Sequence, residues 1–208
     1  MKANDKHEKI LEAAVKVFAS KGFYNAKVAE IAREAGIADG TIYLYFKNKD
    51  DILISLFEEK INKIILRMQA EIQKIENPVE KLRKFITMHL KLVREDRHLA
   101  EVIQVELRQS NKFMREYNPV KFLDYMNIIS SVVKEGQQRN VFRKEVSPGI
   151  VKRALFGALD EMALHFVLVK GSRYDIEKTA DQIADIFILG LTDGKNGDKR
   201  GKKVNPNP

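Results

Sequence analysis

Apolar residues recur at intervals of three and four along almost the whole chain, with charged and polar residues between them. In the first segment, Ile10, Ala14, Val17 and Phe18 fall on one face of a helix that we expect over about residues 6–20. No stretch keeps the strict alternation typical of a half-buried strand, and no internal repeat is visible. The pattern therefore predicts an all-α fold of about nine helices.

Several of the later helices begin at capping sequences. Asn48 precedes Asp50 and Asp51, so we expect it to cap a long helix whose first turn carries acidic residues. Asn77 followed by Pro78 marks another start, because proline is tolerated at the first helical position. Further helices are expected at residues 99–107, at residues 113–138, from Ser147 and from Asp175.

The stretch from residue 28 to residue 46 is the most informative part of the chain. It predicts two short helices joined at Gly36, a residue that adopts the positive φ of a tight turn at little cost. Ala32 is small enough to lie where the two helices cross. This is the arrangement of a helix-turn-helix, whose second helix enters the major groove of DNA. Ala and Gly at this spacing also fit an ordinary helix end, but the whole pattern with lysines on both sides favours DNA binding.

The second short helix is expected to point small and hydroxyl-bearing side chains outward. It has no Arg, Asn or Gln, the usual bidentate readers of base edges. Phosphate contacts should therefore supply much of the affinity and make it dependent on salt. The predicted DNA-contacting residues are Lys27, Ala38, Gly40, Thr41, Tyr43, Tyr45, Lys47 and Lys49.

The formal net charge of +8 is concentrated at the two ends of the chain. Residues 1–49 hold nine basic and six acidic residues, whereas residues 194–208 hold five and one. A basic N-terminal part suits phosphate binding. The Gly-, Pro- and Lys-rich segment 194–208 is expected to be a disordered, solvated tail, with nucleic-acid binding as the alternative.

Several function classes are disfavoured by what the sequence lacks. It has no Cys for a disulfide, a thiolate metal site or a nucleophile, and no glycine-rich phosphate loop. His89, His98 and His165 share no metal-ligand spacing, so we expect neither a metal nor a cofactor. No apolar run approaches the roughly 18 residues of a membrane span, and the polar N-terminus is unlike a signal peptide. We therefore expect a cytoplasmic binding protein, not an enzyme and not a membrane protein.

Residues 10–57 closely resemble the N-terminal domain of TetR-family transcriptional repressors. The resemblance implies an all-helical homodimer whose last two helices form the dimer interface. It also implies that operator DNA is released when a small molecule enters the C-terminal body. On this basis residues 1–48 form a DNA-binding domain and residues 49–193 a ligand-binding and dimerisation domain. The matching motifs are Ala14-Val15-x-Val17-Phe18, Gly22-Phe23, Val28-x-x-Ile31-Ala32-x-x-Ala35-Gly36 and Thr41-Ile42-Tyr43-x-Tyr45-Phe46-x-Asn48-Lys49-x-x-Leu53.

One group within that family, the acyl-CoA-responsive repressors of fatty-acid degradation, is similar to this chain over more of its length. The similarity is carried by residues 38–49, 51–57, 106–111 and 156–161. It implies a long-chain fatty acyl-CoA or fatty acid as the effector. The alternative is a repressor of an efflux or detoxification gene that senses another hydrophobic molecule. Such pockets often combine several carboxylates with aromatic residues, and this chain has no Trp.

The residues themselves support an apolar ligand only weakly, because a tunnel wall and an ordinary helical core use the same side chains. Glu106, Asp160 and Glu161 are expected to pair structurally with Arg108 or Arg153. The candidates for lining an acyl cavity are Phe85, Met88, Leu92, Val102, Ile103, Leu107, Phe122, Tyr125, Met126, Ile129, Phe156, Leu159, Met162 and Phe166. The candidates for contacting a CoA head group are Lys63, Arg67, Arg108 and Lys121.

Overall fold

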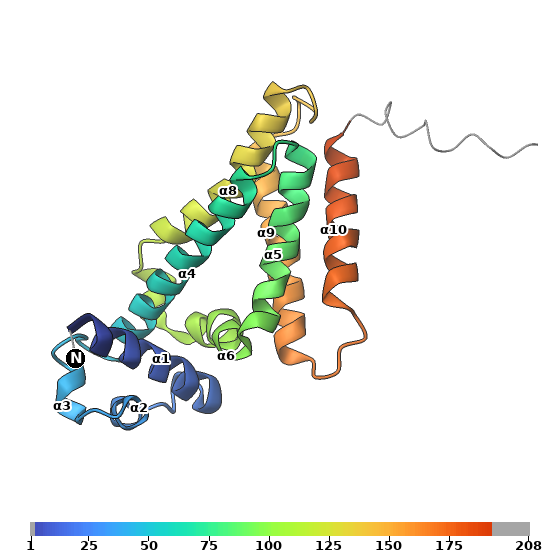
Figure 1. Ribbon diagram of the computed structural model, residues 1–208. Coiled ribbons are helices and arrows are strands. Elements are labelled where there is room, and N and C mark those ends of the chain that lie inside the picture. Colours follow the sequence, from blue (N-terminus) through green and yellow to red (C-terminus); the bar gives the residue numbers. More distant parts are fainter. Residues whose placement is uncertain (1–2, 193–208) are drawn as a thin grey trace, which may run out of the picture.

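The computed structural model describes residues 3–192, and these residues are almost entirely helical. The predicted tail at 194–208 lies outside them. Three helices form a small N-terminal head, drawn in blue in Figure 1. They are α1 (Ala3–Lys21), α2 (Val28–Ala35) and α3 (Asp39–Ile42).

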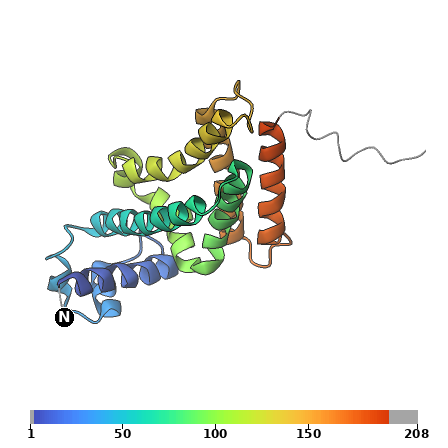
Figure 2. The ribbon, with the colours of Figure 1, turned by 45° about the horizontal axis from the view of Figure 1, so that its top comes forward.

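The remaining helices form a larger body on one side of the head (Figures 1 and 2). Within the body, α5 packs against α8, α9 and α10, and α8 also packs against α4 and α9. Among the described residues no helix is both long and apolar enough to cross a membrane. The body consists of α4 (Lys49–Gln73), α5 (Pro78–Glu95), α6 (Arg97–Glu101), a π-helical turn (Val102–Glu106), a 3-10 turn (Leu107–Gln109), α7 (Asn111–Arg115), α8 (Val120–Gln138), α9 (Pro148–Leu168) and α10 (Ile176–Leu191).

The all-α prediction is confirmed, although the described residues contain ten α-helices instead of about nine. The difference arises at residues 97–138. The single helix expected at 113–138 is divided into α7 and α8, because Pro119 has no N–H with which to continue a helical ladder. The helix expected at 99–107 is α6 followed by a π-helical turn and the start of a 3-10 turn.

The helix starts predicted at Asn48 and Asn77 are confirmed by their capping geometry. The side chain of Asn48 accepts a hydrogen bond of 2.9 Å from the backbone N–H of Asp51 at the start of α4. Asn77 accepts from Val79 at the start of α5. Each cap satisfies a backbone donor that has no partner within its own helix.

The head is held together by the small and apolar residues that the motif supplies. Ala32 and Ile31 on α2 are fully buried, and Gly36 ends α2 with a φ of 67°. A left-handed residue at this position satisfies the last carbonyls of the helix, and glycine adopts it without a steric penalty. The core of the head continues without a break into the body through Phe18 and Leu53. Helix α4, which begins at the head and ends in the body (Figure 1), is therefore shared by both.

Adding one methyl group at Gly136 is expected to destabilise this fold. Gly136 is buried near the end of α8, and a Cβ built there would overlap the ring of Phe142. That ring is only 3% exposed, so it has little room to move away. Overpacking of this kind typically costs about 1–3 kcal/mol. We expect Gly136→Ala to lower the free energy of unfolding by that amount, as measured by urea denaturation.

The matched control is Ser131→Ala, which changes an exposed position in the same helix. A surface substitution away from specific contacts is expected to alter the free energy of unfolding by less than about 0.5 kcal/mol. Equal stability of the two variants would show that Phe142 gives way freely and would contradict the prediction.

Candidate functional site

The outward face of α3 is unusually apolar for a surface that meets water. Tyr43 is 59% exposed and Leu44 81% exposed, and Ala38 and Gly40 are exposed beside them. Thr41 is half-buried at the edge of the same face. Large apolar side chains left in solvent often mark an interaction surface. The predicted outward orientation of Tyr43 is therefore present in the structure.

Other predicted DNA-contacting residues lie around this face and differ in how far they are exposed to solvent. Lys27 lies just before α2, and Lys47 lies in the loop before α4. Both lysines are exposed. Tyr45 is half-buried, and its ring centroid lies 6.3 Å from that of His7 and 6.5 Å from that of Phe46. The lysines are thus available to phosphates, whereas Tyr45 contributes partly to packing within the head.

Lys49 has a different role from the phosphate contact predicted for it. Its ammonium group donates hydrogen bonds to three backbone carbonyls, those of Phe23 at 2.5 Å, Tyr24 at 3.0 Å and Ala26 at 3.1 Å. It also lies 4.6 Å from the centre of the Phe23 ring. An ammonium group has three donors, so all of them are used here. Lys49 therefore anchors the loop between α1 and α2 to the start of α4.

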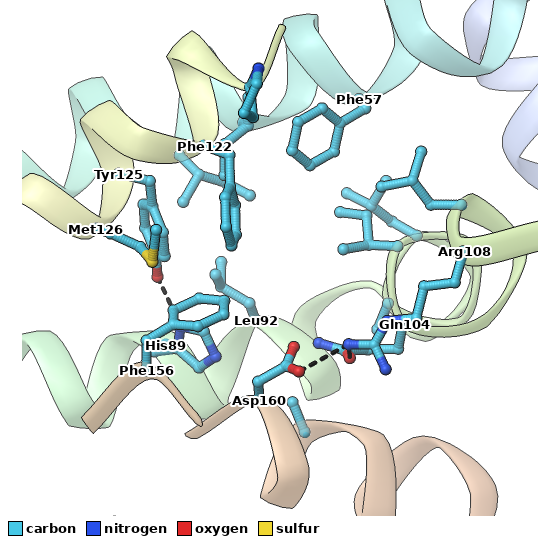
Figure 3. Close-up of a pocket in the computed structure, with 18 of the residues that line it drawn as sticks. Phe57, His89, Leu92, Gln104, Arg108, Phe122, Tyr125, Met126, Phe156 and Asp160 are labelled. Carbon is cyan, nitrogen blue, oxygen red and sulfur yellow. Dashed lines mark hydrogen bonds and ion pairs between the residues drawn. The ribbon is translucent and has the colours of Figure 1, made fainter. Parts of the chain in front are cut away.

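The body contains a partly open cavity of about 640 Å³. It lies between α4, α5, α6, the turns after α6, α7, α8 and α9. Figure 3 shows part of its wall. This volume lies in the range of sites that take drug-sized or cofactor-sized ligands. Half of the residues predicted to line a cavity do line it, namely Leu92, Ile103, Leu107, Phe122, Tyr125, Met126 and Phe156.

The other half of the predicted lining is packed between helices and does not reach the cavity. Phe85, Ile129 and Leu159 show the reason, because each is completely buried against neighbouring helices. Adjacent positions on the inner side of a helix share the same periodicity, whether they face a void or another side chain. The predicted residues outside the lining are Phe85, Met88, Val102, Ile129, Leu159, Met162 and Phe166.

An aromatic cluster that the sequence did not reveal forms one end of the lining. The rings of Phe57 and Phe113 meet edge to face, with centroids 5.2 Å apart. Phe113 stacks on Tyr117 with centroids 4.9 Å apart. These residues come from α4, α7 and the loop after α7, and the break before Pro119 brings the latter two against α4. A five-residue helix gives no periodic signal from which Phe113 and Tyr117 could have been identified.

Two ion pairs lie in the wall of the cavity. Arg67 on α4 makes a bidentate pair with Glu95 at the end of α5, with distances of 2.5 and 2.8 Å. Arg108 pairs with Asp160 on α9 at 2.7 Å, which confirms the pairing expected for Asp160 (Figure 3). Arg153 also lines the cavity, is exposed, and makes no ion pair within the described residues. The lining thus carries three guanidinium groups.

The two lysines predicted to contact a CoA head group lie outside the lining. Lys63 pairs with Glu8 at 2.8 Å and with Glu59 at 3.1 Å. Lys121 donates a hydrogen bond to Asn62 at 3.1 Å. Lys63 thus connects α4 to α1 of the head, and Lys121 connects α8 to α4.

A buried polar pair interrupts the apolar part of the wall. Nδ1 of His89 lies 2.7 Å from the hydroxyl oxygen of Tyr125, and both residues are buried. Burial lowers the pKa of His89 to about 4, since a charged ring is poorly solvated there. The same cause raises the pKa of the Tyr125 hydroxyl. Both groups are therefore neutral at neutral pH. Among the described residues no cluster of three or more His, Asp or Glu is suited to a metal ion.

The π-helical turn connects the cavity wall to the head. Ile103 and Gln104 of this turn line the cavity, while the carboxylate of Glu106 accepts a hydrogen bond of 2.5 Å from the backbone N–H of Phe23. The hydroxyl of Tyr24 donates to the carbonyl of Gln109 at 2.8 Å. The predicted pairing of Glu106 with an arginine is therefore wrong. Its partners are a backbone donor in the loop between α1 and α2 and the side-chain amide of Gln109, which donates at 3.2 Å.

A helix-turn-helix head joined to a body with a large, mainly apolar cavity is the architecture of a ligand-responsive DNA-binding regulator. Comparison with known families supports this class. Residues 10–56 match the family described as bacterial regulatory proteins, tetR family. Residues 57–190 match the C-terminal region of YsiA-like protein. The chain belongs to the tetR family of bacterial transcriptional regulators, which are not enzymes.

Individual relatives resemble the chain over nearly its whole length. A fatty acid metabolism regulator protein of Bacillus subtilis is 38% identical over 186 residues, which cover 89% of this chain and 95% of that protein. The crystal structure of the transcriptional regulator FadR from Bacillus subtilis in complex with stearoyl-CoA has a TM-score of 0.82 at 38% identity, covering 88% of this chain and 98% of that one. The fatty acid degradation regulator FadR from Bacillus halodurans has a TM-score of 0.84 at 36% identity, covering 92% and 98%.

Proposed function

We propose that the protein is a homodimeric repressor of fatty-acid degradation genes that binds a pseudo-palindromic operator and releases it when a long-chain fatty acyl-CoA enters the body. One observation carries this proposal. The apolar cavity with arginines in its wall lies in a chain that is 38% identical to a regulator crystallised with stearoyl-CoA.

The lining suits both parts of an acyl-CoA. The aromatic and aliphatic side chains provide an apolar surface for the acyl chain, and each buried methylene contributes about 0.8 kcal/mol. About 14 methylenes therefore give roughly 11 kcal/mol before the costs of association and ordering are subtracted. Arg153, which makes no ion pair among the described residues, supplies a free cation for the phosphates of a CoA head group. Arg67 and Arg108 are paired with Glu95 and Asp160, but each guanidinium has five N–H donors and keeps some beyond those that it gives to the carboxylate.

A cationic drug as effector is less well supported by the same lining. Its carboxylates are already engaged, since Glu95 pairs with Arg67 and Asp160 with Arg108. Asp96 accepts a hydrogen bond from the backbone of Leu99 at the start of α6. Two of the three carboxylates are therefore already neutralised by arginines, and the third is held in place as a helix cap.

The C-terminal helices supply a surface suited to a dimer. On α10, Ile186 is 68% exposed and Leu189 69% exposed, on the side of the helix away from α5. On α9, Ile150 and Leu168 are 68% and 61% exposed. Apolar faces of this kind are unfavourable in water unless a partner covers them. A second copy of the chain is the partner that a palindromic operator requires.

Two of the connections between the head and the cavity wall run through elements that a bound ligand would touch. Helix α4 begins at the head and lines the cavity with Phe57, Ile61 and Ile64. The π-helical turn lines the cavity and reaches the loop between α1 and α2 through Glu106. A shift of either element moves the head relative to the body. In a dimer, this changes the separation of the two α3 helices, which must match successive major grooves about 34–36 Å apart.

The proposal is tested by titrating the operator-bound protein with stearoyl-CoA in a mobility-shift assay. Allosteric coupling of about 1–3 kcal/mol corresponds to roughly 5- to 150-fold weaker operator binding. We expect a loss of affinity in this range, with free CoA as a control that has no acyl chain and leaves operator binding unchanged. Unchanged affinity at saturating stearoyl-CoA would overturn the proposed effector.

A further inference from the structure

One polar atom in the pair formed by His89 and Tyr125 has no hydrogen-bond partner. The hydrogen bond to Tyr125 uses Nδ1 of His89, and Nε2 has no hydrogen-bond partner within the described residues. Among the described residues, the fully buried side-chain atom that lacks a hydrogen-bond partner is Nε of Arg143. Nε2 of His89 also lacks a partner but is not in that class, so it is not fully buried. Because His89 lines the cavity, its free ring nitrogen opens onto the space where a ligand would lie.

The hydrogen bond with Tyr125 also indicates where the ring proton lies. The Tyr125 hydroxyl is buried, and its contact with His89 is its hydrogen bond among the described residues. A buried O–H without an acceptor is costly, so the hydroxyl is best placed as the donor to Nδ1. In a neutral imidazole the proton is then on Nε2. His89 therefore presents an N–H donor to the cavity.

This donor lies where the charged part of the cavity wall meets the aromatic part. The Arg108–Asp160 pair is close on one side, and the charge of Asp160 acts on His89. On the other side the rings of Phe122 and Phe156 face the cavity, with the Phe156 ring edge-to-face against His89 at 5.9 Å (Figure 3). An acyl-CoA has one polar atom at the matching boundary, the carbonyl oxygen of the thioester between the charged head and the apolar chain.

We propose that His89, oriented by Tyr125, is a specificity-determining residue that donates a hydrogen bond from Nε2 to the thioester carbonyl of the effector. This inference rests on the proposed function and specifies which part of the ligand the wall recognises. A neutral donor matches an uncharged carbonyl without a desolvated charge on either side. The carbonyl in turn supplies the acceptor that Nε2 lacks in the free protein.

The test compares stearoyl-CoA with its thioether analogue, octadecyl-CoA, which has no carbonyl. A neutral hydrogen bond contributes enough to change a dissociation constant by about 2- to 12-fold. We expect the wild-type protein to bind the thioester more tightly than the thioether by that factor, measured by isothermal titration calorimetry. In His89→Leu the two ligands are expected to bind equally. Tyr125→Phe, which keeps the ring but releases His89, is expected to reduce the preference.

The control is His98→Leu, because His98 is exposed on α6 and lies outside the lining. It is expected to keep the wild-type preference. A purely structural role for His89 would weaken both ligands by the same factor and leave their ratio unchanged, which would overturn the inference. A wild-type protein with no preference would overturn it as well. If the wild type binds neither ligand, the proposed effector itself is wrong, so the two failures are distinguishable.

Discussion

Leu189→Arg is expected to separate the protein into monomers and to weaken operator binding by at least about 100-fold. Leu189 is 69% exposed on the outer face of α10, next to Ile186 in the surface that we assign to the dimer. An arginine there places a charge in an apolar interface, where an unpaired charge is strongly unfavourable. A monomer presents one α3 helix to one half-site, and specific binding commonly exceeds non-specific binding by 10³-fold or more.

Analytical ultracentrifugation measures the first effect and a mobility-shift assay with the operator measures the second. Leu66→Arg is the matched control, because Leu66 is an apolar residue on α4 that is 59% exposed and lies outside the cavity lining. The control is expected to remain dimeric and to bind the operator normally. A dimeric Leu189→Arg variant would place the interface elsewhere on the molecule.

The head could be predicted from the sequence because its determinants are local. The turn at Gly36, the small contact at Ala32 and the outward position of Tyr43 depend on residues close to one another in the chain. Lys49 is the exception. Its side chain reaches carbonyls more than twenty residues away, and spacing alone cannot distinguish a lysine that binds backbone from one that faces a phosphate.

The cavity could be predicted only in part, since periodicity identifies the inner side of a helix but not what that side meets. Leu92 lines the cavity, whereas Phe85 two turns earlier on the same helix is packed in the core. The difference depends on how far α4 and α5 diverge, which is a property of the assembled body. Phe113 and Tyr117 reach the lining through the break before α8, which changes the direction of the chain.

The coupling between the cavity and the head could not be predicted at all. Glu106 and Phe23 are 83 residues apart in the sequence, and the partner of the carboxylate is a backbone N–H, which every residue except proline has. The sequence indicated an acidic residue among apolar ones and favoured an arginine as its partner. A buried carboxylate can equally accept a hydrogen bond from a peptide N–H, and this is what Glu106 does in the structure.

Glu106→Ala is expected to weaken the communication between the ligand and the operator while leaving both binding sites in place. The substitution removes the hydrogen bonds that Glu106 accepts from the backbone N–H of Phe23 and from the side-chain amide of Gln109. The side chain of Glu106 points toward the head, and Glu106 itself is not part of the cavity lining. We therefore expect stearoyl-CoA to bind within about 3-fold of wild type, a change of less than about 1 kcal/mol.

The expected loss is in the ratio of operator affinities without and with the ligand. In the wild type this ratio is expected to lie between about 5 and 150. With the hydrogen bond through Glu106 removed, α4 and the packing of α1 against α6 and the π-helical turn still connect the cavity to the head, but we expect the ratio to fall by at least about 5-fold. The N–H of Phe23 also loses its partner, which lowers the free energy of unfolding by about 1–3 kcal/mol. Both quantities are measured on the same preparation, by mobility shift and by urea denaturation.

Two further variants separate coupling from simple loss of stability. Glu106→Gln keeps a carbonyl oxygen that can accept a hydrogen bond from the backbone N–H of Phe23. Its ratio of operator affinities without and with the ligand is therefore expected to stay close to that of the wild type. Glu116→Ala removes an exposed carboxylate just after α7 and is expected to behave as wild type. If Glu106→Ala is destabilised but keeps the full ratio of operator affinities, the signal does not depend on the Glu106 hydrogen bond, because a broken link that leaves the response intact cannot be part of its path.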